Sequence, residues 1–186
     1  MVLTPSSMLP LGTKAPDFSL PDTVSGQTYN LQQLKSDIAT VVMFICNHCP
    51  YVQYIIEEVA NVANEYKNKN IHFIAISAND IQDHPDDSPD NMQKFAKQHH
   101  FTFPYLYDES QKIAKAYHAE CTPDFYVFDK NLHCVYRGRF DASSPGKNVP
   151  VDGKDLREVL NNVLTNKPIS DEQYPSMGCN IKWKSR

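Results

Sequence analysis

Two cysteines separated by two residues are the part of this sequence most capable of chemistry. Cys46 and Cys49 occur in the stretch CNHCP, with His48 between them. Such a pair can form a disulfide, attack one as a thiolate, or supply two ligands to a metal ion. A zinc site would need two more ligands, and no second Cys-x-x-Cys or spaced His pair is present. A distant residue such as Cys121 could still complete one, so the metal alternative stays open.

The elements around the pair favour redox chemistry. Residues 38–45 form a nearly continuous apolar run, typical of a strand buried on both faces. Apolar residues then recur at helical spacing over 52–66. A helix start after a buried strand offers unpaired N–H groups and a positive dipole end, which favour a thiolate. We expect Cys46, at the helix start, to be the exposed nucleophile with a lowered pKa. Cys49, one turn further in, would be the covered resolving thiol.

Other residues could modify this site. A protonated His48 would stabilise the thiolate of Cys46. Cys121 is either a half-buried loop cysteine or a third thiol near the pair, and Cys179 is expected to be an exposed spare thiol rather than a mobile resolving cysteine. The acidic stretch 79–91 lacks the glycine and terminal glutamate of a calcium loop and is interpreted as a solvated connection.

The rest of the chain supplies alternating strands and helices. Strands alternating with helices predict an α/β domain with a largely parallel sheet, and a hairpin adds an antiparallel edge, so the central sheet should be mixed. Residues 168–186 show no period and are interpreted as a C-terminal tail. The predicted elements after the first helix are strands at 71–78 and 103–107, a helix opening at Ser88-Pro89, a helix around 113–117, a hairpin over 125–139 and a helix over 156–164.

Length and charge limit the function. The 186 residues fit one domain, and the net charge of −4 leaves no basic patch for nucleic acid. No apolar run reaches the roughly 18 residues of a membrane span. The N-terminus lacks the features of a signal peptide, so we expect a cytoplasmic protein. In a reducing compartment a Cys-x-x-Cys pair is more often catalytic or metal-binding than structural.

Three stretches carry a resemblance to a known family: LGTKAPDFSLPDTVSGQTYNLQQL, FICNHCP and CTPDFYVFD. Together they resemble the thioredoxin-like redoxins, which include the AhpC/TSA peroxiredoxins and the thiol-disulfide oxidoreductases. The chain also resembles cytoplasmic redoxin-domain proteins described as probable thiol-disulfide isomerases or thioredoxins. The likeness covers about residues 10–165. It implies a single domain over 1–186 with a thioredoxin fold: a central mixed sheet flanked by helices, with an N-terminal β extension.

The resemblance also implies a set of site residues. In this fold a cis-proline loop faces the Cys-x-x-Cys pair, and Thr122-Pro123 matches it, lining a groove and presenting backbone to substrate. The site residues implied are Cys46, Cys49 and Pro123 as catalytic, with Asn47, His48, Thr122 and Cys121 tuning the site or contacting substrate.

The family contains two chemistries, and the sequence favours one. The proline and threonine that precede a peroxiredoxin's peroxidatic cysteine are replaced by Ala39 and Met43 in the register of Cys46. The register of Cys49 fits no better. We therefore expect dithiol–disulfide exchange through a Cys46–Cys49 disulfide, with no cofactor and no bound metal. Protein or small-molecule disulfides would be the substrates, and a separate disulfide reductase would supply electrons. A thiol peroxidase, or a metal-binding protein using Cys46, Cys49 and Cys121, are the alternatives.

Overall fold

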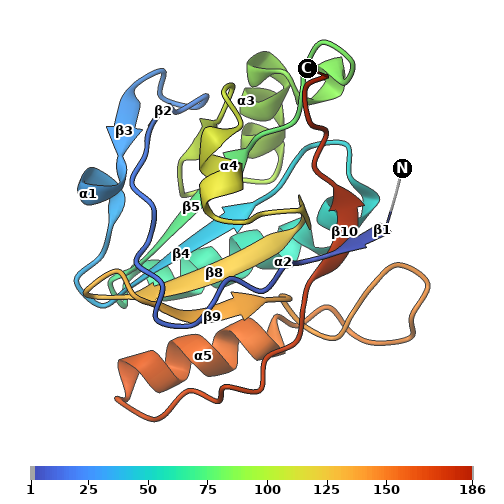
Figure 1. Cartoon of the computed structure of the whole chain (residues 1–186). Helices are drawn as coiled ribbons and strands as arrows, with labels where there is room; N and C mark the ends of the chain where they lie inside the picture. Colours follow the sequence, from blue (N-terminus) through green and yellow to red (C-terminus); the bar gives the residue numbers. More distant parts are fainter. Residues whose placement is uncertain (1–2, 186) are drawn as a thin grey trace.

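The computed structural model describes residues 3–185, and a five-stranded mixed sheet forms its centre (Figure 1). β4 (Ala39–Phe44) pairs in parallel with β5 (Ile71–Ser77) and antiparallel with β8 (Asp124–Asp129). β6 (Tyr105–Tyr107) and β9 (Cys134–Gly138) are the two edge strands. All six residues of β4 are buried, which explains why its sequence is apolar without alternation. The predicted mixed sheet is confirmed.

Helices and the N-terminal segment cover the two faces of this sheet. One apolar cluster joins three helices to the face that includes Val41 and Met43, and a second joins a short helix and the N-terminal segment to the face with Val42 and Phe44. The flanked α/β architecture with an N-terminal β extension therefore also agrees with the prediction. No helix within residues 3–185 is long and apolar enough to cross a membrane. The first cluster includes α2 (Pro50–Lys67), α3 (Pro89–Gln98) and α5 (Lys154–Leu164); the second includes α4 (Lys112–Ala116) and the segment with β2 (Ser19–Pro21), β3 (Thr28–Asn30) and α1 (Leu31–Leu34).

A second, three-stranded sheet joins three distant parts of the chain. Its order is β1 (Leu3–Pro5), β10 (Met177–Asn180) and β7 (Cys121–Thr122), all antiparallel. In Figure 1 β10 (red) passes beside β1 (blue) near the start of α2. The prediction of a C-terminal tail is therefore wrong over β10. A strand of four residues is too short to show a period, and its position depends on backbone pairing with residues far away in the sequence.

Candidate active site

The loop between β4 and α2 carries both cysteines, but the helix starts later than the sequence suggested. α2 begins at Pro50, and Cys49 is its N-cap residue. Proline is well suited to the first helical position because its missing N–H has no partner to lose there. Cys46 thus precedes the helix, and Cys49 occupies the position that had been predicted for Cys46. The expected exposure of Cys46 is also wrong: the two cysteines are 1% and 0% exposed.

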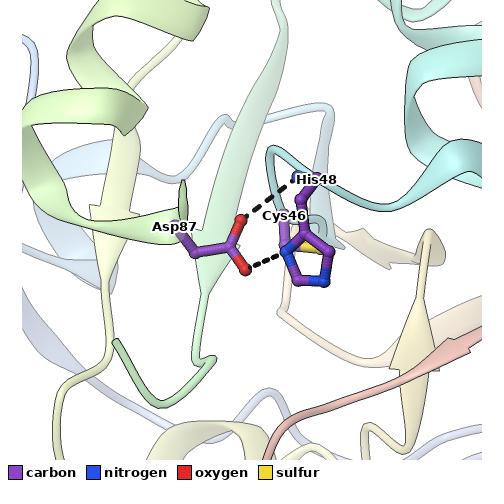
Figure 2. A group of neighbouring side chains, drawn as sticks. All are labelled: Cys46, His48 and Asp87. Carbon is purple, nitrogen blue, oxygen red and sulfur yellow. Dashed lines mark hydrogen bonds and ion pairs between the residues drawn. The ribbon is translucent and has the colours of Figure 1, made fainter. Parts of the chain in front are cut away.

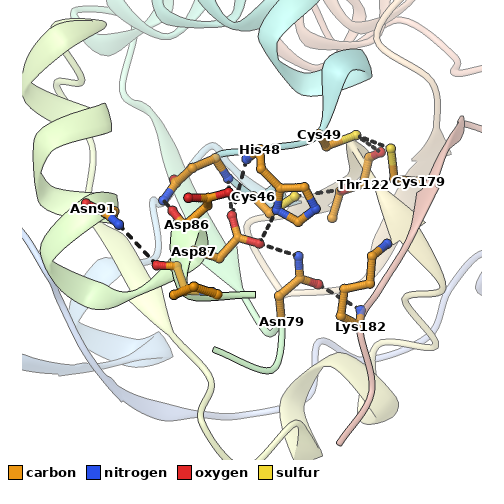
Figure 3. Close-up of polar contacts among 12 residues, drawn as sticks. Cys46, His48, Cys49, Asn79, Asp86, Asp87, Asn91, Thr122, Cys179 and Lys182 are labelled. Carbon is orange, nitrogen blue, oxygen red and sulfur yellow. Dashed lines mark hydrogen bonds and ion pairs between the residues drawn. The ribbon is translucent and has the colours of Figure 1, made fainter. Parts of the chain in front are cut away.

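The segment before β8 packs against both sulfurs. The Thr122–Pro123 peptide bond is cis. The Thr122 Oγ1 atom lies 3.4 Å from Cys46 Sγ, and the Thr122 carbonyl oxygen lies 3.3 Å from Cys49 Sγ (Figure 3). The structure therefore brings Thr122 and Pro123 together with the cysteine pair. The backbone of Thr122 is not open on the side of β10, however, because Thr122 pairs with Cys179 there.

Cys179 lies at the centre of this site and not on the surface. It is 2% exposed, and its sulfur lies 2.8 Å from Cys49 Sγ (Figure 3). The expectation of an exposed spare thiol is wrong, because β10 inserts between β1 and β7 and carries Cys179 into the core. Cys121 precedes Thr122 on β7 and is 0% exposed, so it is fully buried and not half-buried. Burial raises the pKa of the Cys121 thiol well above its ordinary value.

Asn47 fixes the conformation of the cysteine loop. Its side-chain amide donates to the Asp86 carbonyl at 2.9 Å, and its amide oxygen accepts from the Tyr105 hydroxyl at 3.0 Å. The Gln53 side chain donates to the Asn47 carbonyl at 2.9 Å. Asn47 is only 7% exposed, so in this structure it anchors the loop to its surroundings.

A buried carboxylate, Asp87, organises the other side of the loop. It ends the short 3-10 helix η1 (Pro85–Asp87) and is 0% exposed. Its Oδ1 accepts from the backbone N–H groups of Asn47 at 2.8 Å and His48 at 3.3 Å. Its Oδ2 accepts from His48 Nδ1 at 2.5 Å and from the Asn79 side chain at 2.7 Å (Figures 2 and 3). Four donors thus surround one carboxylate.

Asp87 was missed in the sequence, where residues 79–91 had been interpreted as a solvated connection. The signal that could have found it is topological. The segment follows β5, which lies parallel to and beside β4. Because the carboxyl ends of parallel neighbours meet at one edge of a sheet, polar residues after β5 can reach the cysteine loop after β4.

The Asp87–His48 contact sets the charges beside Cys46. The hydrogen bond to Asp87 raises the pKa of His48, although burial opposes the shift. Burial works to raise the pKa of Asp87, but hydrogen bonds from His48 and Asn79 outweigh it and hold this pKa below its usual value. Both shifts favour the ion pair of an imidazolium with a carboxylate. The positive charge expected to favour a Cys46 thiolate is matched by a negative one.

Among the three clustered thiols, Cys49 is the one whose pKa is lowered. The hydrogen bond that Cys46 donates to Cys49, together with burial and the charge of Asp87, raises the pKa of Cys46 well above its ordinary value. The pKa of Cys49 falls to about 5, because Cys46, Cys179 and the Val52 N–H donate to its sulfur, although burial opposes the shift. A hydrogen bond with the Thr122 side chain lowers the pKa of Cys49 further. The predicted lowering of the Cys46 pKa is wrong for the reduced protein, and the helix N-terminus acts on Cys49 instead.

A metal ion fits this arrangement poorly. Within residues 3–185, one group of three such donors could share an ion: Cys46, His48 and Asp87, with ligand atoms within 4.8 Å of one another. A carboxylate offers about four lone-pair positions, and the four donors to Asp87 occupy them. An ion would have to displace some of these hydrogen bonds. Cys121, the third ligand of the metal alternative, does not belong to this group.

Comparison with known proteins places the chain in a class and then in a family. The fold is that of the thioredoxin-like redoxins: the thioredoxin domain of a thiol-disulfide oxidoreductase from Bacteroides vulgatus matches with a TM-score of 0.63 at 14% identity, over 82% of this chain and 99% of that one. The family model described as AhpC/TSA family matches residues 11–137. The chain belongs to the AhpC/TSA family.

Two solved structures match nearly the whole chain. An uncharacterized conserved protein from Geobacillus kaustophilus is 49% identical, with a TM-score of 0.98 over 100% of this chain and 98% of that one. A hypothetical protein from Sinorhizobium meliloti is 42% identical, with a TM-score of 0.96 over 98% and 100%. No significant match was found among curated proteins. Family and fold together identify a redoxin, and the particular reaction must be argued from the site.

Proposed function

We propose that the protein is a thiol-disulfide oxidoreductase that works through Cys46 and Cys49. The observation that carries the proposal is the meeting of three groups. The two cysteines lie in one loop, each thiol affects the pKa of the other, and both sulfurs contact Thr122, next to the cis bond of Pro123. Two thiols held this close can close a disulfide and reopen it, which is the central requirement of dithiol–disulfide exchange.

Both sulfurs are buried, and Cys46 is the one that a smaller rearrangement would open to a substrate. Cys49 is enclosed by Thr122, Cys179 and Cys46, so access to it would require removal of a strand. Cys46 lies beside His48, whose side chain is 19% exposed. A shift of the imidazole would open a path to the Cys46 sulfur, whereas β10 can stay in place.

The reaction divides into two exchange steps. Cys46 Sγ attacks one sulfur of a substrate disulfide, its proton passes to the Cys49 thiolate, and the other substrate sulfur leaves as a thiolate. Cys49 then gives this proton to the leaving thiolate and attacks Cys46 Sγ. The second substrate thiolate departs, the substrate is reduced by two electrons, and a Cys46–Cys49 disulfide remains. A separate disulfide reductase would return the two electrons.

A groove of about 440 Å³ beside Pro123 offers a place for the substrate. Its lining includes Tyr51, Tyr54 and Phe140 together with Leu3 and Met177 of the three-stranded sheet. Leu3, Tyr54 and Met177 are exposed although they are large and apolar. This surface suits the apolar side chains that flank a disulfide in a protein or peptide.

The test is to trap a substrate on Cys46. In Cys49→Ala the first attack remains and the second is blocked, so covalent adducts should accumulate and disappear on adding dithiothreitol. Cys46→Ala should form none, and Cys134→Ala, which removes a buried thiol from β9, should behave as wild type. Adducts on Cys46→Ala but none on Cys49→Ala would reverse the roles of the two cysteines.

Two further readouts separate the alternatives. Reductase-coupled turnover of hydrogen peroxide by the wild type, without adducts on Cys49→Ala, would favour a thiol peroxidase. Stoichiometric zinc in the purified protein, again without adducts, would favour a metal-binding role. Neither is expected.

A further inference from the structure

Cys179 is close enough to Cys49 to bond to it. The two sulfurs are 2.8 Å apart. A disulfide bond measures about 2.05 Å, so closing one here needs an approach of less than about 1 Å. Strand β10 therefore presents Cys179 as a second possible bonding partner for Cys49, the thiol that can also pair with Cys46.

The strand that carries Cys179 is held firmly in register. Within the three-stranded sheet, Cys179 pairs with Leu3 on one side and with Thr122 on the other. Gly178 allows the close approach: a Cβ at this position would lie 1.9 Å from the Thr122 carbonyl oxygen. Further along, the Ile181 N–H donates to the Glu120 carbonyl at 3.0 Å. Backbone pairing on both sides thus makes the approach of Cys179 to Cys49 a fixed feature of the fold.

A purely structural thiol looks different in the same molecule. Cys134 on β9 is also buried, but its sulfur faces the Tyr136 carbonyl oxygen of its own strand at 3.4 Å. Cys179 faces a thiol whose pKa is about 5 and which can also pair with Cys46. Packing alone explains Cys134, whereas Cys179 has a neighbour with which it can react.

We propose that Cys179 is a third redox-active cysteine that exchanges with Cys46 for the bond to Cys49. The inference rests on the proposed function, because it starts from the Cys46–Cys49 disulfide. The Cys179 thiolate attacks Cys49 Sγ, a Cys49–Cys179 bond forms, and Cys46 Sγ leaves with the bonding electron pair. The proton lost by Cys179 ends on Cys46. One disulfide replaces another, so no external oxidant is needed.

The protonation of Cys179 is consistent with this step. Burial, the hydrogen bond to Cys49 and the negative charge of Cys49 raise the pKa of Cys179 to about 12. Once Cys49 is in a disulfide with Cys46, its charge is gone and two of these three causes are removed. Cys179 therefore becomes more acidic in the state in which it must attack.

The exchange changes what the oxidised protein can do. The disulfide moves to Cys49–Cys179, away from the partly exposed His48. Cys46 becomes a thiol again beside His48, while its resolving partner is occupied. A new mixed disulfide on Cys46 would then persist until another thiol attacked it, which is the behaviour that rearranging a substrate's disulfides requires.

Disulfide mapping tests the proposal directly. Cys46 and Cys49 share a tryptic peptide, because no Lys or Arg separates them, so the variant to use is Cys46→Ser. The full-length variant is equilibrated with glutathione buffers, quenched with acid, alkylated, digested and mapped. We expect a cross-link between the Cys49 and Cys179 peptides in most molecules under oxidising conditions. The cross-link should vanish in Cys46→Ser/Cys179→Ser and persist in Cys46→Ser/Cys134→Ala.

The outcomes separate this inference from the proposed function. If folded Cys46→Ser keeps both Cys49 and Cys179 open to alkylation under conditions that oxidise the wild-type pair, the inference is overturned, even where Cys49→Ala still traps substrate. If the cross-link forms but Cys49→Ala traps nothing, the cysteine pair is established and the proposed function fails. Should Cys46→Ser not fold, fragmentation of the cross-linked peptides of the oxidised wild type decides the question. A Cys49–Cys179 link there supports the inference, and a Cys46–Cys49 link alone overturns it.

Discussion

Cys49 lies between two other thiols, Cys46 and Cys179, and different kinds of interaction hold these two in place. On one side, Cys46 sits in a loop whose conformation depends on polar side chains, with Asp87 receiving four donors. On the other side, Cys179 is placed by a backbone ladder between β1 and β7. The Cys46 side contains two titratable side chains, His48 and Asp87. The two residues that pair with Cys179, Leu3 and Thr122, carry no charge. Protonation should therefore tune the Cys46 side, whereas the Cys179 side should respond to changes in volume.

Removing the Asp87 carboxylate should have the largest effect, because it supports the whole Cys46 side. Asp87→Ala leaves two backbone N–H groups, the Asn79 amide and the His48 imidazole without their acceptor. Breaking a buried charge pair in this way costs about 3–5 kcal/mol. We expect a loss of that order in the free energy of unfolding, measured by urea denaturation. Asp86→Ala, at an exposed neighbour that uses only its backbone carbonyl, should cost less than about 0.5 kcal/mol. Equal losses in the two variants would contradict the role given to Asp87.

The ion pair of His48 and Asp87 predicts that stability depends on pH. The folded-state pKa of His48 is raised, so its contribution to stability is fully present below the unfolded pKa of about 6.5 and is lost as pH rises through the folded value. The folded-state pKa of Asp87 is lowered, so its contribution is present above about 3.9 and is lost as pH falls through the folded value. The stability difference between wild type and Asp87→Asn should therefore be greatest between about pH 4 and 6.5. A difference that is constant from pH 4 to 9 would contradict the ion pair.

A larger side chain at position 178 tests the interactions that hold Cys179 in place. In Gly178→Ala the added Cβ would meet the backbone oxygen of Thr122, which cannot move as a side chain could. Overpacking of this kind costs about 1–3 kcal/mol, and β10 must shift away from Cys49. In a Cys46→Ser background we expect at least a tenfold smaller fraction of the Cys49–Cys179 cross-link. Met177→Ala, at a 44% exposed position of the same strand, is the matched control and should retain the cross-link.

Removing the third thiol alone should have a smaller effect. In Cys179→Ala the Cys49 thiolate loses one of its donors, so the pKa of Cys49 should rise from about 5. A hydrogen bond to a charged group is worth about 1.5 kcal/mol or more, equivalent to a roughly tenfold change in acidity. Thiolate absorbance followed against pH would measure it, with Cys134→Ala as the control. An unchanged titration would show that Cys179 does not donate to Cys49.

The smallest effect should come from the imidazole. A thiolate with a pKa near 5 stabilises the reduced form, so the Cys46–Cys49 couple should lie above about −270 mV, the value of thioredoxin. Because the charge of His48 is matched by Asp87, His48→Gln should lower this potential by less than about 30 mV. Equilibration with glutathione gives both numbers. A couple at or below −270 mV would remove the argument, and a much larger shift would mean that His48 acts on the sulfurs directly.

Local patterns were enough to predict the part of the site that depends on short stretches of chain. The apolar run of β4, the stripe of α2 and the Cys-x-x-Cys pair between them are all readable from neighbouring residues. Even the helix start was signalled, because Pro50 is better placed at the first helical position than within the first turn. A helix that begins at Pro50 has Cys49 as its N-cap residue.

The positions of Asp87 and Cys179 could not be predicted from local patterns. Each depends on which distant segments lie side by side: Asp87 on the parallel pairing of β4 and β5, and Cys179 on the pairing of β10 with β7. Neither segment has a periodic apolar pattern, since one is a short acidic turn and the other a strand of four residues. Their effect on protonation therefore could not be foreseen, because the donors and charges around each sulfur come from non-local contacts.

The three-stranded sheet also bears on self-association. An exposed strand edge is a template onto which another chain can add, and the proposed exchange with protein disulfides would bring other polypeptides close to this sheet. Here β10, the longest strand, is central, and its neighbours have three and two residues. β1 ends at Pro5, and β7 runs directly into Pro123; neither proline can donate a backbone hydrogen bond. Brief strands closed by proline are poor templates, so the sheet that positions Cys179 should also resist aggregation by strand addition.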